Sequence, residues 1–325
     1  MSTIEQVPAT GDSWMFLMRL GKFEAAWELS DQVLEERRGQ PCGHWPRHFQ
    51  YIWDGSPVAG RRVLVRCYHG LGDTIQFIRY ASLLKQVGAH VIVWAQSVLL
   101  PLLETVHGVD RVLPLHDGLP AVDYDADVEL MELPHVFRTS LKTIPNKVPY
   151  VSVPSIQQHE SALLKVGVVW RSGAWDERRS MSASLMAELD GVPGVELHVL
   201  QNRVDADEWP RQVGKRVCPE PVTELARAIS GLDLLITIDS LAAHLGGALA
   251  VPTWTLLPAH ADWRWMEKRS DSPWYPTMRL WRQSRVGDWR TVIDNVRTEL
   301  ATWADAQCQN RCGGAVSVRG QAVRA

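Results

Sequence analysis

The stretch LLITIDSLAAHLGGALAVPTWTLLP, residues 234–258, determines the predicted fold. Leu234–Ile238 is a short, apolar and β-branched run, which is typical of a strand buried on both faces of a parallel sheet. Asp239 and Ser240 are helix-capping residue types, and the Ala-, Leu- and Gly-rich residues after them favour a helix that packs close to the sheet. A second apolar run ends the stretch as the next strand. We therefore predict a βαβ unit whose helix start can bind a phosphate.

The composition is that of a globular protein with more than one core. The chain has 325 residues, of which 46% are hydrophobic, and two domains are the expectation at this length. The net charge of −3 gives no reason to expect a nucleic-acid partner. The five cysteines are scattered and odd in number, which fits a reducing compartment. The start of the chain lacks a signal-peptide pattern and no apolar run is long enough to span a membrane, so we predict a cytoplasmic protein, with room only for a peripheral membrane contact.

The order of apolar patterns predicts four regions. Residues 1–56 contain apolar residues at helical spacing in 14–20 and Phe23–Arg37, which indicates a helical hairpin followed by a linker. Residues 57–155 and 156–304 both alternate short strands with helices, which predicts two Rossmann-like α/β domains. Residues 305–325 are rich in Gly, Ala, Ser and Arg and are expected to be a disordered tail.

Several sequence blocks resemble glycosyltransferase family 9, and in particular its heptosyltransferase-like members that often carry tetratricopeptide repeats. The blocks keep their order and are GLGDTIQFIRYASLL (70–84), VGVVW (166–170), IDSLAAHLGGALAVPTWTLLP (238–258) and DWRW (262–265). The resemblance implies the GT-B fold, in which two Rossmann-like domains face each other across a cleft. It also implies a nucleotide-diphosphate sugar, with ADP-heptose as the suggested donor. The N-terminal hairpin resembles a remnant of one tetratricopeptide repeat.

The GLGD turn carries the predicted catalytic residue. A dinucleotide fingerprint would need a glycine where Ile75 stands, so the turn does not favour NAD. The first turn of a helix favours an ionised carboxylate, which suits Asp73 as a general base, and the family resemblance implies the same role. The alternative is that Asp73 only caps its helix. Gly70 and Gly72 would allow a ligand to approach the backbone, and we place them with His69 and Gln76 on the acceptor side.

The departing nucleotide diphosphate needs stabilisation by a metal or by fixed cations and helix N–H groups. The sequence has no clustered metal-ligand pattern in these segments, and the family resemblance implies a metal-independent reaction without a cofactor. Arginine forks can hold phosphate oxygens, and a helix start can hold the diphosphate from the other side. The predicted donor-binding residues are Arg171, Arg179, Ser180, Gln201, Asp239, Ser240, Leu241, Ala242, His244, Asp262 and Arg264.

The sequence therefore predicts an inverting glycosyltransferase that moves a sugar from a nucleotide-sugar donor to the hydroxyl of a glycan, glycolipid or protein acceptor. Two alternatives stay open at this level. A sugar-nucleotide epimerase can use the same fold, although it needs more acid and base groups around one sugar. A binding or scaffold protein can keep the fold without the reaction and act through its N-terminal hairpin.

Overall fold

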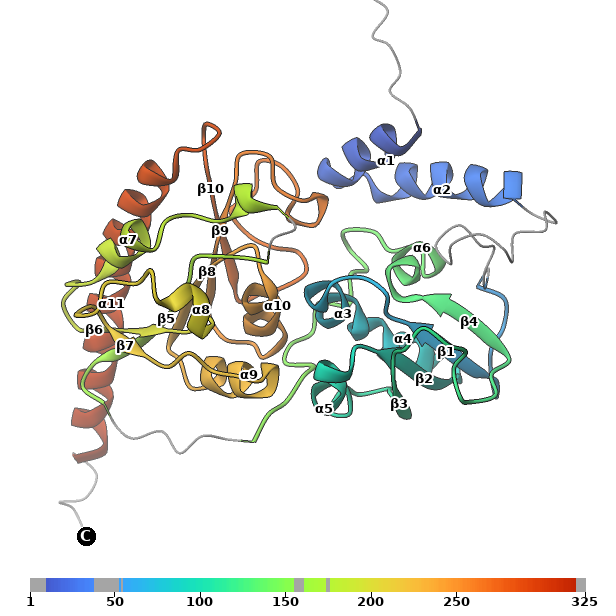
Figure 1. Cartoon of the computed structure of the whole chain (residues 1–325), viewed down its shortest axis with the longest axis horizontal. Coiled ribbons are helices and arrows are strands. Elements are labelled where there is room, and N and C mark those ends of the chain that lie inside the picture. The colour runs from blue at the N-terminus through green and yellow to red at the C-terminus, as the bar shows by residue number, and fades with distance from the viewer. Residues whose placement is uncertain (1–9, 38–52, 54, 155–160, 174–175, 320–325) are drawn as a thin grey trace, which may run out of the picture. The chain divides into compact units, whose positions relative to one another are not determined.

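A computed structural model describes residues 10–37, 53, 55–154, 161–173 and 176–319. The chain forms two compact units, each built around its own sheet (Figure 1). The first unit comprises Met1–Val153, Gly247–Ala250 and Ala261–Pro276, and the second comprises the remaining segments. The sequence predicted contiguous domains and a separate hairpin. The structure instead includes the hairpin and two later segments in the first unit, and most of the predicted linker lies outside the described residues.

The first unit contains a four-stranded parallel sheet in the order β3-β2-β1-β4. Its central strand β1 pairs Val63 with Val91 of β2, and Val65 with Val128 of β4. These apolar residues are fully buried, as expected for a parallel sheet covered on both faces. The strands are β1 (Arg62–Arg66), β2 (His90–Ala95), β3 (Arg111–Pro114) and β4 (Ala126–Glu129).

Two helices of the first unit precede the sheet, and the others are short and follow the strands. They are α1 (Thr10–Arg19), α2 (Phe23–Arg37), α3 (Leu71–Phe77), α4 (Ala81–Gln86), α5 (Leu100–Leu103) and α6 (Leu133–Val136). Single 3-10 turns add η2 (Ile78–Tyr80), η3 (Ser97–Leu99), η4 (Leu130–Glu132) and η7 (Trp263–Trp265). Helices α1 and α2 form the predicted hairpin.

Aromatic side chains hold the returning segment Ala261–Pro276 in the first unit. The Trp14 ring of α1 meets Trp263 edge-on at a centroid distance of 5.6 Å, and Phe23 of α2 lies 6.1 Å from Trp274. Phe77 of α3 stacks on Trp263 at 6.0 Å. Large aromatic rings bury much apolar area, so these contacts explain why a segment distant in sequence belongs to this unit.

The second unit contains a six-stranded parallel sheet in the order β10-β9-β8-β5-β6-β7. Strand β8 (Leu234–Ile238) lies inside this sheet and is buried along its whole length, which confirms the prediction from the apolar run. It is followed by α10 (Leu241–Ala248) and β9 (Thr253–Leu257), so the predicted βαβ unit is present. The other strands are β5 (Leu164–Val169), β6 (Val195–Val199), β7 (Lys215–Arg216) and β10 (Met278–Arg282).

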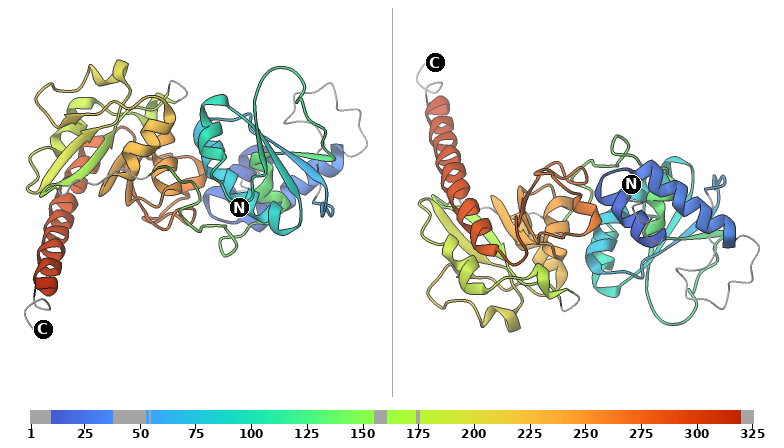
Figure 2. Two further views of the ribbon diagram at one scale, coloured as in Figure 1. Left: turned by 90° about the horizontal axis from the view of Figure 1, so that it is seen from below. Right: turned by 90° about the horizontal axis from the view of Figure 1, so that it is seen from above.

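The last helix of the second unit corrects the prediction of a disordered tail for residues 305–319, and residues 320–325 lie outside the described part of the chain. Helix α11 (Trp289–Arg319) continues well past residue 305, and in Figure 2 it projects beyond the sheet. Cys308 of this region packs against the same core as the fully buried Ala304 just before it, an apolar contact that the composition of the tail did not indicate. The remaining helices are α7 (Ala183–Met186), α8 (Arg203–Ala206) and α9 (Val222–Ser230), with 3-10 turns η5 (Glu177–Arg179) and η6 (Ala187–Leu189).

No helix within the described part of the chain combines the length and the apolar character needed to cross a membrane.

Candidate active site

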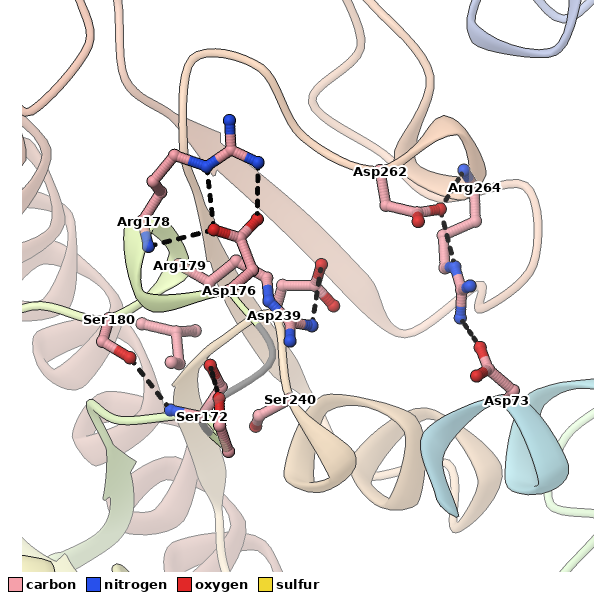
Figure 3. Close-up of polar contacts among 12 residues, drawn as sticks. Asp73, Ser172, Asp176, Arg178, Arg179, Ser180, Asp239, Ser240, Asp262 and Arg264 are labelled. Carbon is pink, nitrogen blue, oxygen red and sulfur yellow. Dashed lines mark hydrogen bonds and ion pairs between the residues drawn. The ribbon is translucent and has the colours of Figure 1, made fainter. Parts of the chain in front are cut away.

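Asp73 lies in the turn that follows β1, and both of its carboxylate oxygens accept hydrogen bonds. The N–H of Gly70 donates to Oδ2 over 2.9 Å, so Asp73 caps helix α3 as the sequence allowed. Nη1 of Arg264 donates to Oδ1 over 2.5 Å (Figure 3). A Cβ at position 70 would lie 3.1 Å from Oδ2, so a larger residue there would require the carboxylate to move by a few tenths of an ångström. The carboxylate is therefore fixed in orientation, and its side chain is still 21% exposed.

Arg264 connects three polar side chains of the first unit. Its Nε donates to Asp262 Oδ1 over 2.8 Å, and Nη1 also reaches Gln76 Oε1 at 3.2 Å. Asp262 begins turn η7 by accepting the Arg264 N–H at 3.1 Å, which fixes the start of the side chain that reaches Asp73. The sequence assigned Asp262 and Arg264 to the donor. The structure brings both of them to Asp73 and Gln76.

His69 and Glu129 form an ion pair at the carboxyl ends of neighbouring strands. Glu129 ends β4 and is 4% exposed, whereas the His69 side chain is 43% exposed and pairs with it through Nε2. The bond to Glu129 raises the pKa of the His69 imidazole above its usual value, although burial acts in the opposite direction. Sequence reasoning missed Glu129. Its only signal was a charged residue at the end of a buried strand, where open α/β sheets place ligand contacts.

Gln96 fixes the backbone of this turn. Its Nε2 donates to the carbonyl of His69 over 2.5 Å, and its Oε1 accepts from Thr74 Oγ1 over 3.0 Å. Thr74 and Gln76 are buried on α3, directly after Asp73. The turn from His69 to Asp73 is thus held by side chains at both ends.

A second group of predicted residues lies in the second unit, near the start of α10. Arg179 Nη1 lies 3.8 Å from Asp239 Oδ2, and Asp239 is 3% exposed (Figure 3). The Ser240 hydroxyl is 3.1 Å from that of Thr237. Ser180 Oγ accepts the N–H of Ser172 at 3.1 Å. An arginine, two hydroxyls and a helix start are suitable groups for a diphosphate.

Gln201 is fully engaged within the second unit. Its Oε1 accepts from the N–H groups of Trp170 and Arg171, and its Nε2 donates to the Arg171 carbonyl and to Asp205. A carboxamide offers two donors and two acceptor positions, so a donor contact would have to replace one of these bonds. The Arg171 guanidinium pairs with Glu208 at 2.7 Å and with Asp205 at 3.4 Å.

The remaining predicted residues lie on α10. Ala242 and His244 are each 3% exposed, and Leu241 is partly buried. His244 therefore belongs to the packed part of the helix. Among the residues that the structure describes, no group of three His, Cys, Asp or Glu side chains is arranged to hold a metal ion.

Comparison with known proteins identifies the fold. No protein-family model matches the chain. Protein FlbA of Caulobacter vibrioides is 24% identical over 334 aligned positions, which cover 89% of this chain but only 54% of FlbA, so the chain spans about half the length of this curated relative. A glycosyl transferase family 9 structure from Veillonella parvula aligns with a TM-score of 0.55 at 11% identity, covering 79% of this chain and all of that one.

Two Escherichia coli structures align in the same way. ADP-heptose lps heptosyltransferase II gives a TM-score of 0.53 at 13% identity, over 76% of this chain and 99% of that one. Heptosyltransferase WaaC with ADP-2-deoxy-2-fluoro heptose also gives 0.53, at 12% identity over 74% of this chain and 98% of that one. The class of the molecule is therefore an α/β protein of the GT-B fold. Its particular fold is the one shared by family 9 glycosyltransferases and ADP-heptose heptosyltransferases.

Proposed function

We propose that the protein is an inverting glycosyltransferase that uses a nucleotide-diphosphate sugar. Asp73 takes the proton from an acceptor hydroxyl while the acceptor oxygen bonds to the anomeric carbon of the donor. The bond from that carbon to the phosphate oxygen breaks, and the nucleoside diphosphate leaves with the electron pair. A single direct displacement inverts the anomeric configuration. The products are the glycosylated acceptor, the nucleoside diphosphate and one proton, which Asp73 returns to solvent.

The geometry of Asp73 carries this proposal. A general base must be held in place and must keep a route to its substrate. Asp73 is bonded to Gly70 and Arg264 and remains partly exposed. A carboxylate has about four lone-pair positions, so two bonds leave room for an acceptor hydroxyl.

The donor is proposed to bind through the second unit. Arg179, Ser240 and the start of α10 supply a cation, a hydroxyl and N–H groups for the two phosphates. Asp239 is the proposed partner of a sugar or ribose hydroxyl. ADP-heptose is the first donor to test, because solved structures of similar fold bind ADP or an ADP-heptose analogue.

Thermal shift against a panel of nucleotide sugars tests the donor. A ligand that binds only the folded form stabilises it by about 2.7 kcal/mol at one hundred times its Kd. We expect ADP-heptose, and ADP alone, to raise the melting temperature of the wild-type protein. We expect Arg179→Ala to reduce the shift at least threefold at the same ligand concentration. A panel without any stabilising nucleotide would contradict the transferase proposal.

Asp73→Asn tests the base. The amide cannot accept the proton, so we expect the rate of sugar transfer to fall at least about a hundredfold while donor affinity stays within about twofold. The exposed Asp117 provides the matched control, and Asp117→Asn should keep the wild-type rate. Product analysis by NMR gives the anomeric configuration. An epimerised donor without transfer would favour the epimerase alternative, and unchanged biological activity of Asp73→Asn would favour a scaffold.

A further inference from the structure

We propose that His69, held by Glu129, binds the acceptor sugar beside the hydroxyl that Asp73 deprotonates. The inference rests on the proposed function, since it assigns the acceptor side of the same site. The ligand class is a sugar that carries a hydrogen-bond-accepting oxygen next to its reacting hydroxyl. His69 is the binding residue, and Glu129 is a positioning residue that acts through it.

The two imidazole nitrogens of His69 have different surroundings. Nε2 of His69 is the nitrogen that pairs with the Glu129 carboxylate. Among the residues that the structure describes, none forms a hydrogen bond to Nδ1. The ring is nearly half exposed, whereas its carboxylate partner is buried. A buried carboxylate behind a histidine fixes the orientation of the ring and leaves its other nitrogen available to a ligand.

The position of His69 in the chain also supports this role. His69 lies four residues before Asp73, in one turn whose backbone is fixed by the Gln96 bond to the His69 carbonyl and by the Gly70 bond to Asp73. Asp73 acts electrostatically on His69, as does Arg264. The imidazole and the proposed base thus come from one short turn, and a sugar bound at Asp73 is expected to reach His69 as well.

The charged groups around His69 favour its protonated form. The groups that act on His69 are Glu129 of β4, Asp73 of α3 and Arg264 of η7. The two carboxylates raise its pKa and Arg264 lowers it, with Glu129 the strongest influence. A protonated imidazole donates from both nitrogens, and a charge-assisted hydrogen bond is about twice as strong as a neutral one. Acceptor binding should thus be strong below the raised pKa of His69 and weaken as the pH rises through it.

Steady-state kinetics with ADP-heptose and a set of methyl hexosides tests the assignment. We expect His69→Ala to raise the acceptor KM about tenfold or more, the effect of losing one charged hydrogen bond, while the donor KM stays within about twofold. His69→Gln keeps an N–H donor that does not titrate, so it should recover part of the affinity and remove the alkaline rise in acceptor KM. Glu129→Gln should move that rise to lower pH.

His90 offers a matched control. It is an exposed histidine in the same unit, 3.5 Å from Asp110, at the opposite end of the sheet strands from Asp73. His90→Ala should keep the wild-type acceptor KM and pH profile. A wild-type acceptor KM in His69→Ala, or a wild-type pH profile in Glu129→Gln, would overturn the inference while the transferase proposal stands. A wild-type protein that transfers to none of the sugars counts against the transferase proposal itself.

Imidazole NMR of the free protein tests the pair without any acceptor. The signal lost in His69→Gln should titrate above the usual histidine range in the wild-type protein and shift to lower pH in Glu129→Gln. Methyl hexosides added to Asp73→Asn should move this signal. If Glu129→Gln leaves the pKa of His69 unchanged, the inference is wrong.

Discussion

At the scale of single residues, Asp73 and Arg264 form the contact on which the site depends. They are 191 positions apart in the chain and meet at 2.5 Å. The Arg264 side chain is 10% exposed and also contacts Asp262 and the ring of Phe77. A partly buried arginine between two carboxylates holds both of them in fixed positions. Arg264 therefore acts on the proposed base directly.

The double-mutant cycle of Arg264→Gln and Asp73→Asn tests this contact. If Arg264 works through Asp73, the single change should lower kcat about tenfold and add little to Asp73→Asn, giving a coupling of about 1 kcal/mol or more. Steady-state rates at saturating ADP-heptose measure this. The control is Arg269→Gln, which removes an arginine of the same segment that pairs with Asp271. If Arg264→Gln instead raises the donor KM, and its effect adds to that of Asp73→Asn, then Arg264 binds the donor, as the sequence predicted.

The sequence identified Asp73 and its neighbours in the GLGD turn, but not the contacts that Arg264 and Glu129 make there. The GLGD turn is local, and its residues are adjacent in the chain, so residue types alone could locate it. Arg264 and Glu129 join it only through tertiary contacts, and neither has a local pattern that links it to position 73. The prediction for Gln201 shows a different limit of the sequence. The end of a strand predicts a place near ligands, but it does not show that four hydrogen bonds already use the side chain.

Close packing limits which residues helix α10 can contain. Its buried run of small residues was predicted from composition, and the structure supplies the reason. A Cβ on Gly247 would lie 2.2 Å from the Tyr275 ring, and one on Gly246 would lie 2.5 Å from Thr253. Real Cβ atoms do not approach so closely. Positions 246 and 247 of α10 thus leave no room for a side chain.

Gly247→Ala should therefore destabilise the protein. Alanine would favour the helix by about 1 kcal/mol, but overpacking against Tyr275 costs about 1–3 kcal/mol, so we expect a net loss or, at best, no gain. Urea unfolding followed by far-UV circular dichroism measures the difference. Gly173→Ala is the control, because no atom lies within 4 Å of its added Cβ. A clear stabilisation by Gly247→Ala would contradict the close contact.

At the scale of the whole molecule, the chain does not divide at one point. The alternation of strands and helices predicted two α/β units, and the two parallel sheets confirm this. The segment Ala261–Pro276 was assigned by sequence order to the second unit, because apolar periodicity cannot show against which core a loop packs. In the structure Trp274 and Tyr275 are fully buried in the first unit, where the Arg79 guanidinium donates to the Trp274 carbonyl and lies over the Tyr275 ring.

A fragment of residues 1–153 should therefore fail to form a well-packed domain. It lacks Trp263 and Trp274, which pack on Trp14, Phe23 and Phe77, and it leaves the buried Arg79 without one of its carbonyl acceptors. Near-UV circular dichroism should be weak and binding of a hydrophobic dye strong, as in a molten globule. Joining residues 261–276 to this fragment through a Gly/Ser linker should restore part of the packing. A sharp, cooperative unfolding transition of the fragment alone would contradict the expectation.

The return of Ala261–Pro276 to the first unit also governs how such proteins can recombine. A hybrid joined once, near residue 154, would combine the GLGD turn of one parent with the DWRW segment of the other. Its Asp73 would then pair with the arginine of the other parent, in a segment whose tryptophans also come from that parent. Hybrids that exchange donor preference should keep both segments from the same parent, which requires additional crossover points around residues 261 and 276.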